Sequence, residues 1–139
     1  MELKHLIDSS SFLKKYRYLE QSYDFSKIKI SNILLHYKRG IHLIHNKKLI
    51  VEDLKNEIIF LIFLSYHNNN ISQENASRIW SLICKALLLK IFDQYLLIDY
   101  PLYKKFIFIV GMGKIGVKDL NFTSDIDIII FFDSKNSSY

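Results

Sequence analysis

Hydrophobic residues recur at helical spacing over the first hundred residues of the chain. Their positions step by three and four, as one apolar face of a helix requires. Four segments follow this pattern: residues 3–22, 26–45, 52–66 and 73–97. The Ser9–Ser11 run interrupts the first segment and predicts a second helix that begins at a serine cap. Ser72 is likewise typical of the cap of the last helix, which is expected to end before the sole proline, Pro101.

The pattern changes after residue 101 to two short apolar runs. Phe106–Val110 and Ile126–Phe132 are rich in β-branched and aromatic residues, which is typical of buried strands. The fold class expected is therefore α+β, with a helical region over residues 1–100 followed by a β-hairpin within residues 101–139.

The turn between these two runs carries the chemistry. Gly111 and Gly113 let backbone N–H groups approach phosphate oxygens, and Lys114 adds a positive charge. Alternation along a strand places Asp125 and Asp127 on one face, where two carboxylates repel each other unless cations neutralise them. Hard oxygen ligands of this kind suit Mg²⁺. The residues predict a metal–nucleotide site that transfers a group at phosphorus in line between two oxygens.

The same stretch resembles a known signature. Between Gly111 and Asp127 the chain reads GMGKIGVKDLNFTSDID. This string resembles the signature of bacterial glutamine synthetase adenylyltransferase, a bifunctional adenylyl-transferring and adenylyl-removing enzyme of the DNA polymerase β-like nucleotidyltransferases. Most positions match over about eighteen residues, and the residue pattern is closer to the first of the two catalytic domain copies in the family.

The resemblance implies roles for particular residues. It implies that the catalytic metal ligands are Asp125 and Asp127. It also implies that the phosphates of ATP or ADP are bound by Gly111, Gly113, Lys114 and Ser124. Glutamine synthetase is the implied partner, and the implied reaction is Mg²⁺-dependent AMP transfer to one of its tyrosines or phosphorolytic removal from it.

Departures from the family pattern weaken the expectation of activity. Val117 replaces a usual glycine and Thr123 a usual serine or alanine, although neither touches the carboxylates. The family's third carboxylate, from a later strand, is missing: Asp133 lies about 20 Å along the strand from Asp127, whereas two catalytic metals lie about 4 Å apart. We therefore expect a truncated nucleotidyltransferase sheet that is inactive alone.

Three alternatives have to be weighed against this interpretation. Gly111 to Gly116 also matches the G-x-G-x-x-G dinucleotide fingerprint, but residues 117–124 are too few and too polar for the crossover helix which that motif needs. A non-catalytic interaction module, completed by another polypeptide at its exposed sheet edge, stays open. So does a small stand-alone nucleotidyltransferase.

Composition adds a few limits. The net charge of +5 is spread along the chain and suits a nucleotide or an acidic protein, and no nucleic-acid-binding motif is present. Single Cys84 excludes an internal disulfide and suits a reducing cytoplasm, and no apolar run reaches the length of a membrane span. His36, His42 and His45 are expected to be solvated or half-buried rather than metal ligands, and Trp80 to be a core residue.

Overall fold

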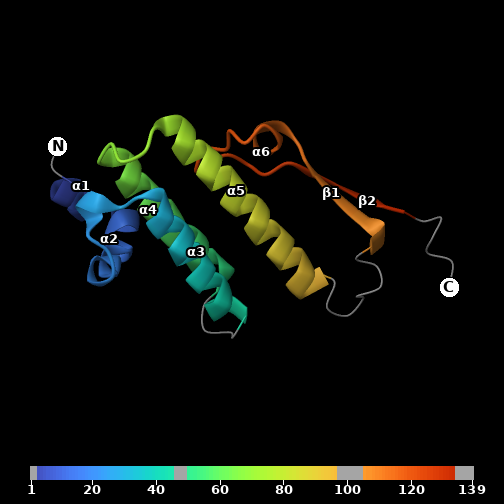
Figure 1. The fold of residues 1–139 in the computed structure, drawn as a ribbon, viewed down its shortest axis with the longest axis horizontal. Helices are drawn as coiled ribbons and strands as arrows, with labels where there is room; N and C mark the ends of the chain where they lie inside the picture. The colour runs from blue at the N-terminus through green and yellow to red at the C-terminus, as the bar shows by residue number, and fades with distance from the viewer. Residues whose placement is uncertain (1–2, 46–49, 97–104, 134–139) are drawn as a thin grey trace. The chain divides into compact units, whose positions relative to one another are not determined.

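The computed structural model describes residues 3–45, 50–96 and 105–133. Helices dominate the N-terminal part and an antiparallel pair of strands follows, so the predicted α+β class is confirmed (Figure 1). The chain forms two compact units, residues 1–76 and 77–139. The boundary that the sequence predicts between residues 100 and 101 lies outside the described residues.

The first unit is entirely helical in its described part. Its elements are α1 (Leu3–Ser9), α2 (Ser11–Lys15), the 3-10 turns η1 (Arg17–Gln21) and η2 (Phe25–Lys27), α3 (Ile30–His45) and α4 (Val51–His67). The Ser10 Oγ accepts a hydrogen bond from the Leu13 N–H at 3.3 Å, so the predicted serine break is confirmed. Helix α3 begins four residues later than predicted, because Asp24 accepts from the Ser26 N–H and holds η2 as a separate turn.

Helices α3 and α4 lie side by side and form the centre of this unit (Figure 1). Gly40 makes the close approach possible, because a Cβ at this position would overlap the Leu54 side chain. Six hydrophobic side chains of α4 are completely buried: Leu54, Ile58, Phe60, Leu61, Ile62 and Leu64. Burial of one such side chain stabilises the fold by about 1.5–3 kcal/mol.

A polar network crosses the same core. Glu57 is only 7% exposed, and its carboxylate accepts hydrogen bonds from the Tyr18 hydroxyl and from His36 Nε2, the latter at 2.8 Å. The other ring nitrogen of His36 lies 3.1 Å from the Tyr23 hydroxyl. One carboxylate from α4 therefore joins η1, the loop after it and α3.

The second unit contains most of α5 (Gln73–Ile91), a π turn η3 (Phe92–Leu96), β1 (Ile107–Gly111), α6 (Gly113–Gly116) and β2 (Ile128–Phe132). The Ser72 Oγ accepts from the Asn75 N–H at 3.2 Å, which confirms the predicted cap of α5. The α-helix ends at Ile91, earlier than predicted, because the π turn replaces its last turn.

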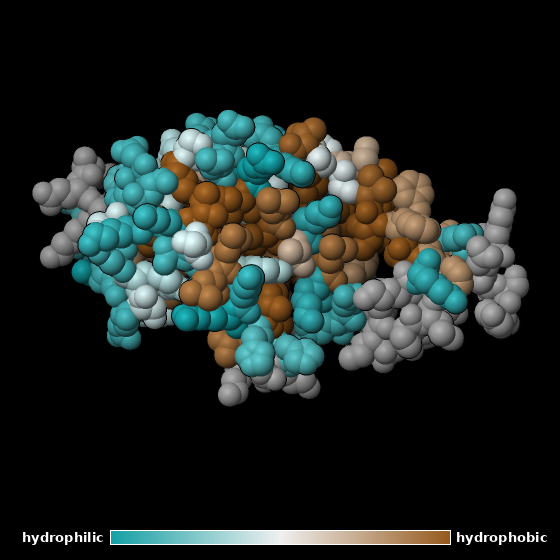
Figure 2. Space-filling model, in the orientation of Figure 1, coloured by the Kyte–Doolittle hydropathy of each residue, from teal (hydrophilic) through white to brown (hydrophobic). Residues whose placement is uncertain are grey.

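The two strands pair in antiparallel register, with Ile107 opposite Phe132 and Gly111 opposite Ile128. None of their ten residues is buried; Phe108 is 57% and Phe131 51% exposed. Figure 2 shows hydrophobic residues at the surface over α5 and towards the strands. The prediction of buried strands is therefore wrong for the described residues, because a sheet of two strands leaves most of its apolar surface uncovered.

One finding concerns membranes. Among the described residues no helix combines the length and the apolar character that a membrane span needs.

Candidate functional site

The turn after β1 has a backbone that suits glycine at two positions. Gly113 has φ +52°, and a Cβ there would lie 3.3 Å from the Asp127 Oδ2. A Cβ on Gly116 would lie 2.7 Å from the Gly111 carbonyl oxygen, which is closer than real side chains approach. Met112 donates its N–H to the Asp127 carbonyl at 2.8 Å. The glycine turn is thus tied to the second carboxylate of the predicted pair.

Both carboxylates lie just ahead of β2, not within it. The sequence predicts a strand from Ile126, but β2 begins at Ile128, so Asp125 and Asp127 stand on the loop that leads into the strand. They still share one hollow of about 430 Å³. The hollow contains five of the six predicted site residues, with two neighbours: Gly113, Lys114, Asn121, Thr123, Ser124, Asp125 and Asp127.

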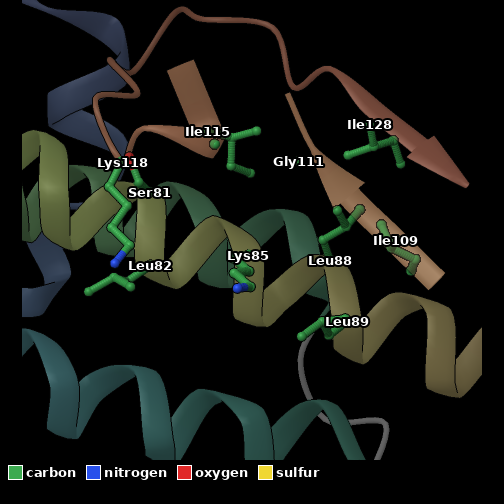
Figure 3. Close-up of a pocket in the computed structure, with 11 residues that line it drawn as sticks. Ser81, Leu82, Lys85, Leu88, Leu89, Ile109, Gly111, Ile115, Lys118 and Ile128 are labelled. Atoms are coloured by element: carbon green, nitrogen blue, oxygen red, sulfur yellow. The ribbon is translucent and has the colours of Figure 1, made fainter. Parts of the chain in front are cut away.

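Gly111 is the predicted site residue that does not line this hollow. It ends β1 opposite Ile128 and borders a smaller hollow of about 160 Å³ beside α5. Figure 3 shows this second hollow, with Leu88 and Leu89 of α5 on one side and Ile109 and Ile128 of the strands on the other. Asp127 and Ile128 therefore open onto different hollows, as alternation along an extended chain requires.

Lys114 and Ser124 meet across the larger hollow. The Lys114 ammonium donates to the Ser124 Oγ at 3.3 Å, and that hydroxyl donates in turn to the Asn121 Oδ1 at 2.6 Å. Within the described residues neither Asp125 nor Asp127 forms an ion pair with a basic side chain. The two carboxylates are exposed and keep their oxygens available to an added cation.

The donor set fits a hard cation that brings further ligands with it. In the part of the chain that the structure describes, no three His, Cys, Asp or Glu side chains gather as a metal site. Mg²⁺ is commonly held by one or two carboxylates and completed by water and substrate phosphate oxygens. Asp125 and Asp127 border a hollow of about 430 Å³ that also contains one lysine, which matches that mode of binding.

The antiparallel pairing also decides against the dinucleotide alternative. A G-x-G-x-x-G fingerprint leads through a crossover helix into a parallel strand. Here α6 ends at Gly116 and a loop leads to an antiparallel partner.

Sequence reasoning misses three residues that organise this site and its surroundings. Asn121 holds its own loop, while Trp80 and Ser81 of α5 bind that loop through hydrogen bonds. An Asn followed by Thr and Ser is a usual turn signal, which could have identified the first. Nothing in the spacing of α5 indicates that Ser81 faces a residue 39 positions away.

Comparison with known proteins agrees with the motif. The family model for glutamate-ammonia ligase adenylyltransferase matches residues 58–139, more than half of the chain. No solved structure matches the chain.

Two relatives share short stretches with the chain. The bifunctional glutamine synthetase adenylyltransferase/adenylyl-removing enzyme of Mesorhizobium japonicum is 47% identical over 36 residues, which is 26% of this chain and 4% of that protein. The protein of the same name from Rhizobium meliloti is 48% identical over 29 residues, 21% of this chain and 3% of that protein. The alignments thus span a small part of each relative. By the match of its family model, this chain belongs to the glutamate-ammonia ligase adenylyltransferase family.

Proposed function

We propose that the larger hollow binds a Mg²⁺–nucleotide complex and serves AMP transfer on glutamine synthetase. Asp125 and Asp127 would hold the metal ion. Gly113, Lys114 and Ser124 would contact the phosphates, and Gly111 would shape the turn. The observation that carries the proposal is the gathering of both carboxylates, the lysine and the serine around one hollow of about 430 Å³.

The chemistry proposed follows from the metal, from the adenylyl-transferring and adenylyl-removing activities in the names of the relatives, and from what the resemblance of the motif implies about a tyrosine acceptor. When bound, Mg²⁺ would offset negative charge on the phosphate oxygens during displacement at phosphorus. In the forward direction a tyrosine hydroxyl attacks the α-phosphorus of ATP, and pyrophosphate leaves. In the reverse function inorganic phosphate attacks the tyrosyl-AMP phosphorus, so that ADP and the free tyrosine form.

We infer that the described residues supply only part of such a catalytic centre. Two carboxylates can hold a metal–nucleotide complex, but no third carboxylate among the described residues joins them in the hollow. Nucleotide binding is accordingly the property to test first, and transfer to glutamine synthetase the second.

Calorimetric titration of the full chain with ADP, in the presence and absence of Mg²⁺, tests the proposal. We expect Mg²⁺-dependent binding that the Asp125→Ala/Asp127→Ala double variant abolishes. Lys114→Ala removes one charge from the phosphate contact and should weaken binding by about tenfold. Asp119→Ala is the matched control, because it removes an exposed carboxylate from the same loop outside the hollow.

Absence of binding by a chain that is folded by circular dichroism would overturn the proposal. The exposed apolar strands would then favour the second candidate, an interaction module whose sheet is continued by another polypeptide. Light scattering would reveal that module as a self-associating species, and substitution of the exposed Phe131 by Ser should reduce the association.

A further inference from the structure

Two hydrogen bonds fasten the loop that carries Asp125 to helix α5. The Trp80 Nε1–H donates to the Asn121 carbonyl oxygen at 3.2 Å. The Leu120 N–H donates to the Ser81 Oγ at 2.9 Å. Ser81 is 2% and Leu120 1% exposed, so the contact between them is shielded from water. The Trp80 ring is 4% exposed, but its partner Asn121 is exposed and this second contact is only partly buried. Leaving a buried N–H without an acceptor costs free energy, so these contacts favour the one loop position in which both hydrogen bonds form.

The side chains on α5 that hold the loop are themselves fixed in position. Ser81 uses its hydroxyl proton on the Ser77 carbonyl oxygen one turn earlier, at 2.8 Å. Its oxygen lone pair is therefore directed at the Leu120 N–H. The Trp80 ring also meets the Phe122 ring edge-on, with 5.9 Å between centroids. Figure 3 places Ser81 on α5 beside Lys118, near the start of the same loop.

The loop end of the fastening leads to the proposed site. The Asn121 Oδ1 accepts from the Ser124 Oγ at 2.6 Å and from the Thr123 N–H at 3.2 Å. The Ser124 N–H donates to the Asn121 carbonyl oxygen, the atom that Trp80 also contacts. One continuous series of hydrogen bonds thus runs from α5 through Asn121 to Ser124, directly before Asp125.

We propose that Trp80 and Ser81 are positioning residues for the metal–nucleotide site, acting through Asn121 on Ser124 and Asp125. They line no part of the larger hollow and would touch neither metal nor nucleotide. This inference rests on the proposed function for the identity of the ligand. Whether α5 fixes the position of the loop can be measured without any ligand. Trp80 is the only tryptophan of the chain, so its fluorescence should respond when the hollow is filled.

Ser81→Ala tests the proposal against a matched control. Ser65→Ala removes a similar buried hydroxyl, fully shielded and donating to the Ile28 carbonyl at 2.8 Å, in the helical unit. Both variants should lose stability. Only Ser81→Ala should weaken Mg²⁺–ADP binding, by about tenfold, the usual effect of one lost buried hydrogen bond. Ser81→Thr keeps the hydroxyl and should restore most of the affinity.

Amide hydrogen exchange of the ligand-free full chain separates this inference from the proposed function. Residues 119–125 should exchange about tenfold faster in Ser81→Ala than in Ser65→Ala. If the wild type binds no Mg²⁺–ADP, the proposed function fails while this exchange comparison still decides whether α5 holds the loop.

Equal exchange of residues 119–125 in the two variants would overturn the inference, and so would unchanged Mg²⁺–ADP affinity in a folded Ser81→Ala chain. If Ser81→Ala does not fold, Trp80→Phe takes its place. It retains an aromatic ring next to Phe122 and removes the donor to Asn121, together with part of the indole ring. Accelerated exchange in that variant supports the inference, and wild-type exchange contradicts it.

Discussion

Helix α4 and the β1–β2 hairpin are both rich in Ile, Leu and Phe, yet they use these residues differently. Six hydrophobic side chains of α4 are completely buried, because α3 and the N-terminal turns pack around them. None of the ten hairpin residues is buried within the described structure. Hydrophobic side chains stabilise a fold in proportion to the surface that they remove from water. Helix α4 therefore stabilises its unit through packing, whereas the hairpin gains little stability from its apolar side chains and depends more on backbone pairing.

The largest expected effect follows directly from this comparison. Phe60→Ala in α4 should lower the free energy of unfolding by about 4 kcal/mol, because it leaves a cavity in a closed core. Phe131→Ala in β2 removes the same atoms from a side chain that is 51% exposed, so its cost should stay below about 1 kcal/mol. Urea unfolding followed by circular dichroism measures both. Equal losses would show that the hairpin is covered in solution, and the comparison would fail.

A smaller effect concerns the polar network of the helical unit. Burial alone would raise the pKa of the Glu57 carboxyl, but hydrogen bonds from His36 and Tyr18 and the charge of His36 outweigh it and lower the pKa below 4.5. A lowered pKa in the folded state gives stability that is present above the ordinary value and is lost as the pH falls through the folded one.

The wild type should therefore lose more stability than Glu57→Gln as the pH falls below 4.5. The difference should amount to about 1 kcal/mol, because the carboxylate accepts two charge-assisted hydrogen bonds. Burial, followed by the hydrogen bond to Glu57, raises the pKa of Tyr18 above its ordinary 10.0, so a second loss is expected as the pH rises above that value. Parallel acid profiles in the two proteins would contradict the role of Glu57.

The sequence predicts those parts of the molecule that depend on neighbours along the chain. Helical spacing and serine caps predict α2, α4 and the start of α5 because capping and amphipathic periodicity are local effects. The glycine turn and the Asp125–Asp127 pair are likewise readable from spacing. The gathering of Lys114, Ser124 and both carboxylates around one hollow agrees with what the motif led us to expect, and their roles stay predictions.

Contacts between distant residues are beyond such reasoning. Glu57 lies in an apolar run, and the pattern of that run does not indicate that hydrogen bonds from His36 and Tyr18 will offset the cost of burying its carboxylate. Ser81 reads as an ordinary helix residue until Leu120 is placed against it. The exposure of β1 and β2 is missed for a similar reason. An apolar strand is buried only where another layer of the fold packs on it, and the sequence of the strand does not show whether such a layer is present.

The smallest effect compares one backbone position in each unit. Lys118 follows α6 with φ +62°, and its N–H donates to the Ile115 carbonyl at 3.3 Å. Asn69 follows α4 with φ +55° and donates to the Tyr66 carbonyl. Both are helix ends in the left-handed region, which glycine adopts freely, asparagine tolerates and lysine adopts at a cost of about 1 kcal/mol.

Lys118→Gly should therefore raise the free energy of unfolding by up to about 1 kcal/mol, and Asn69→Gly by only a few tenths. Thermal unfolding of the two variants measures the difference, with Trp80 fluorescence as the probe of the second unit. A loss of stability in Lys118→Gly would mean that the lysine stem packs on Leu82 and the other apolar residues of the smaller hollow strongly enough to exceed the backbone strain. In the second unit this apolar contact would then contribute more to the free energy of unfolding than the relief of backbone strain does. Side-chain packing would matter there, as it does in the helical unit.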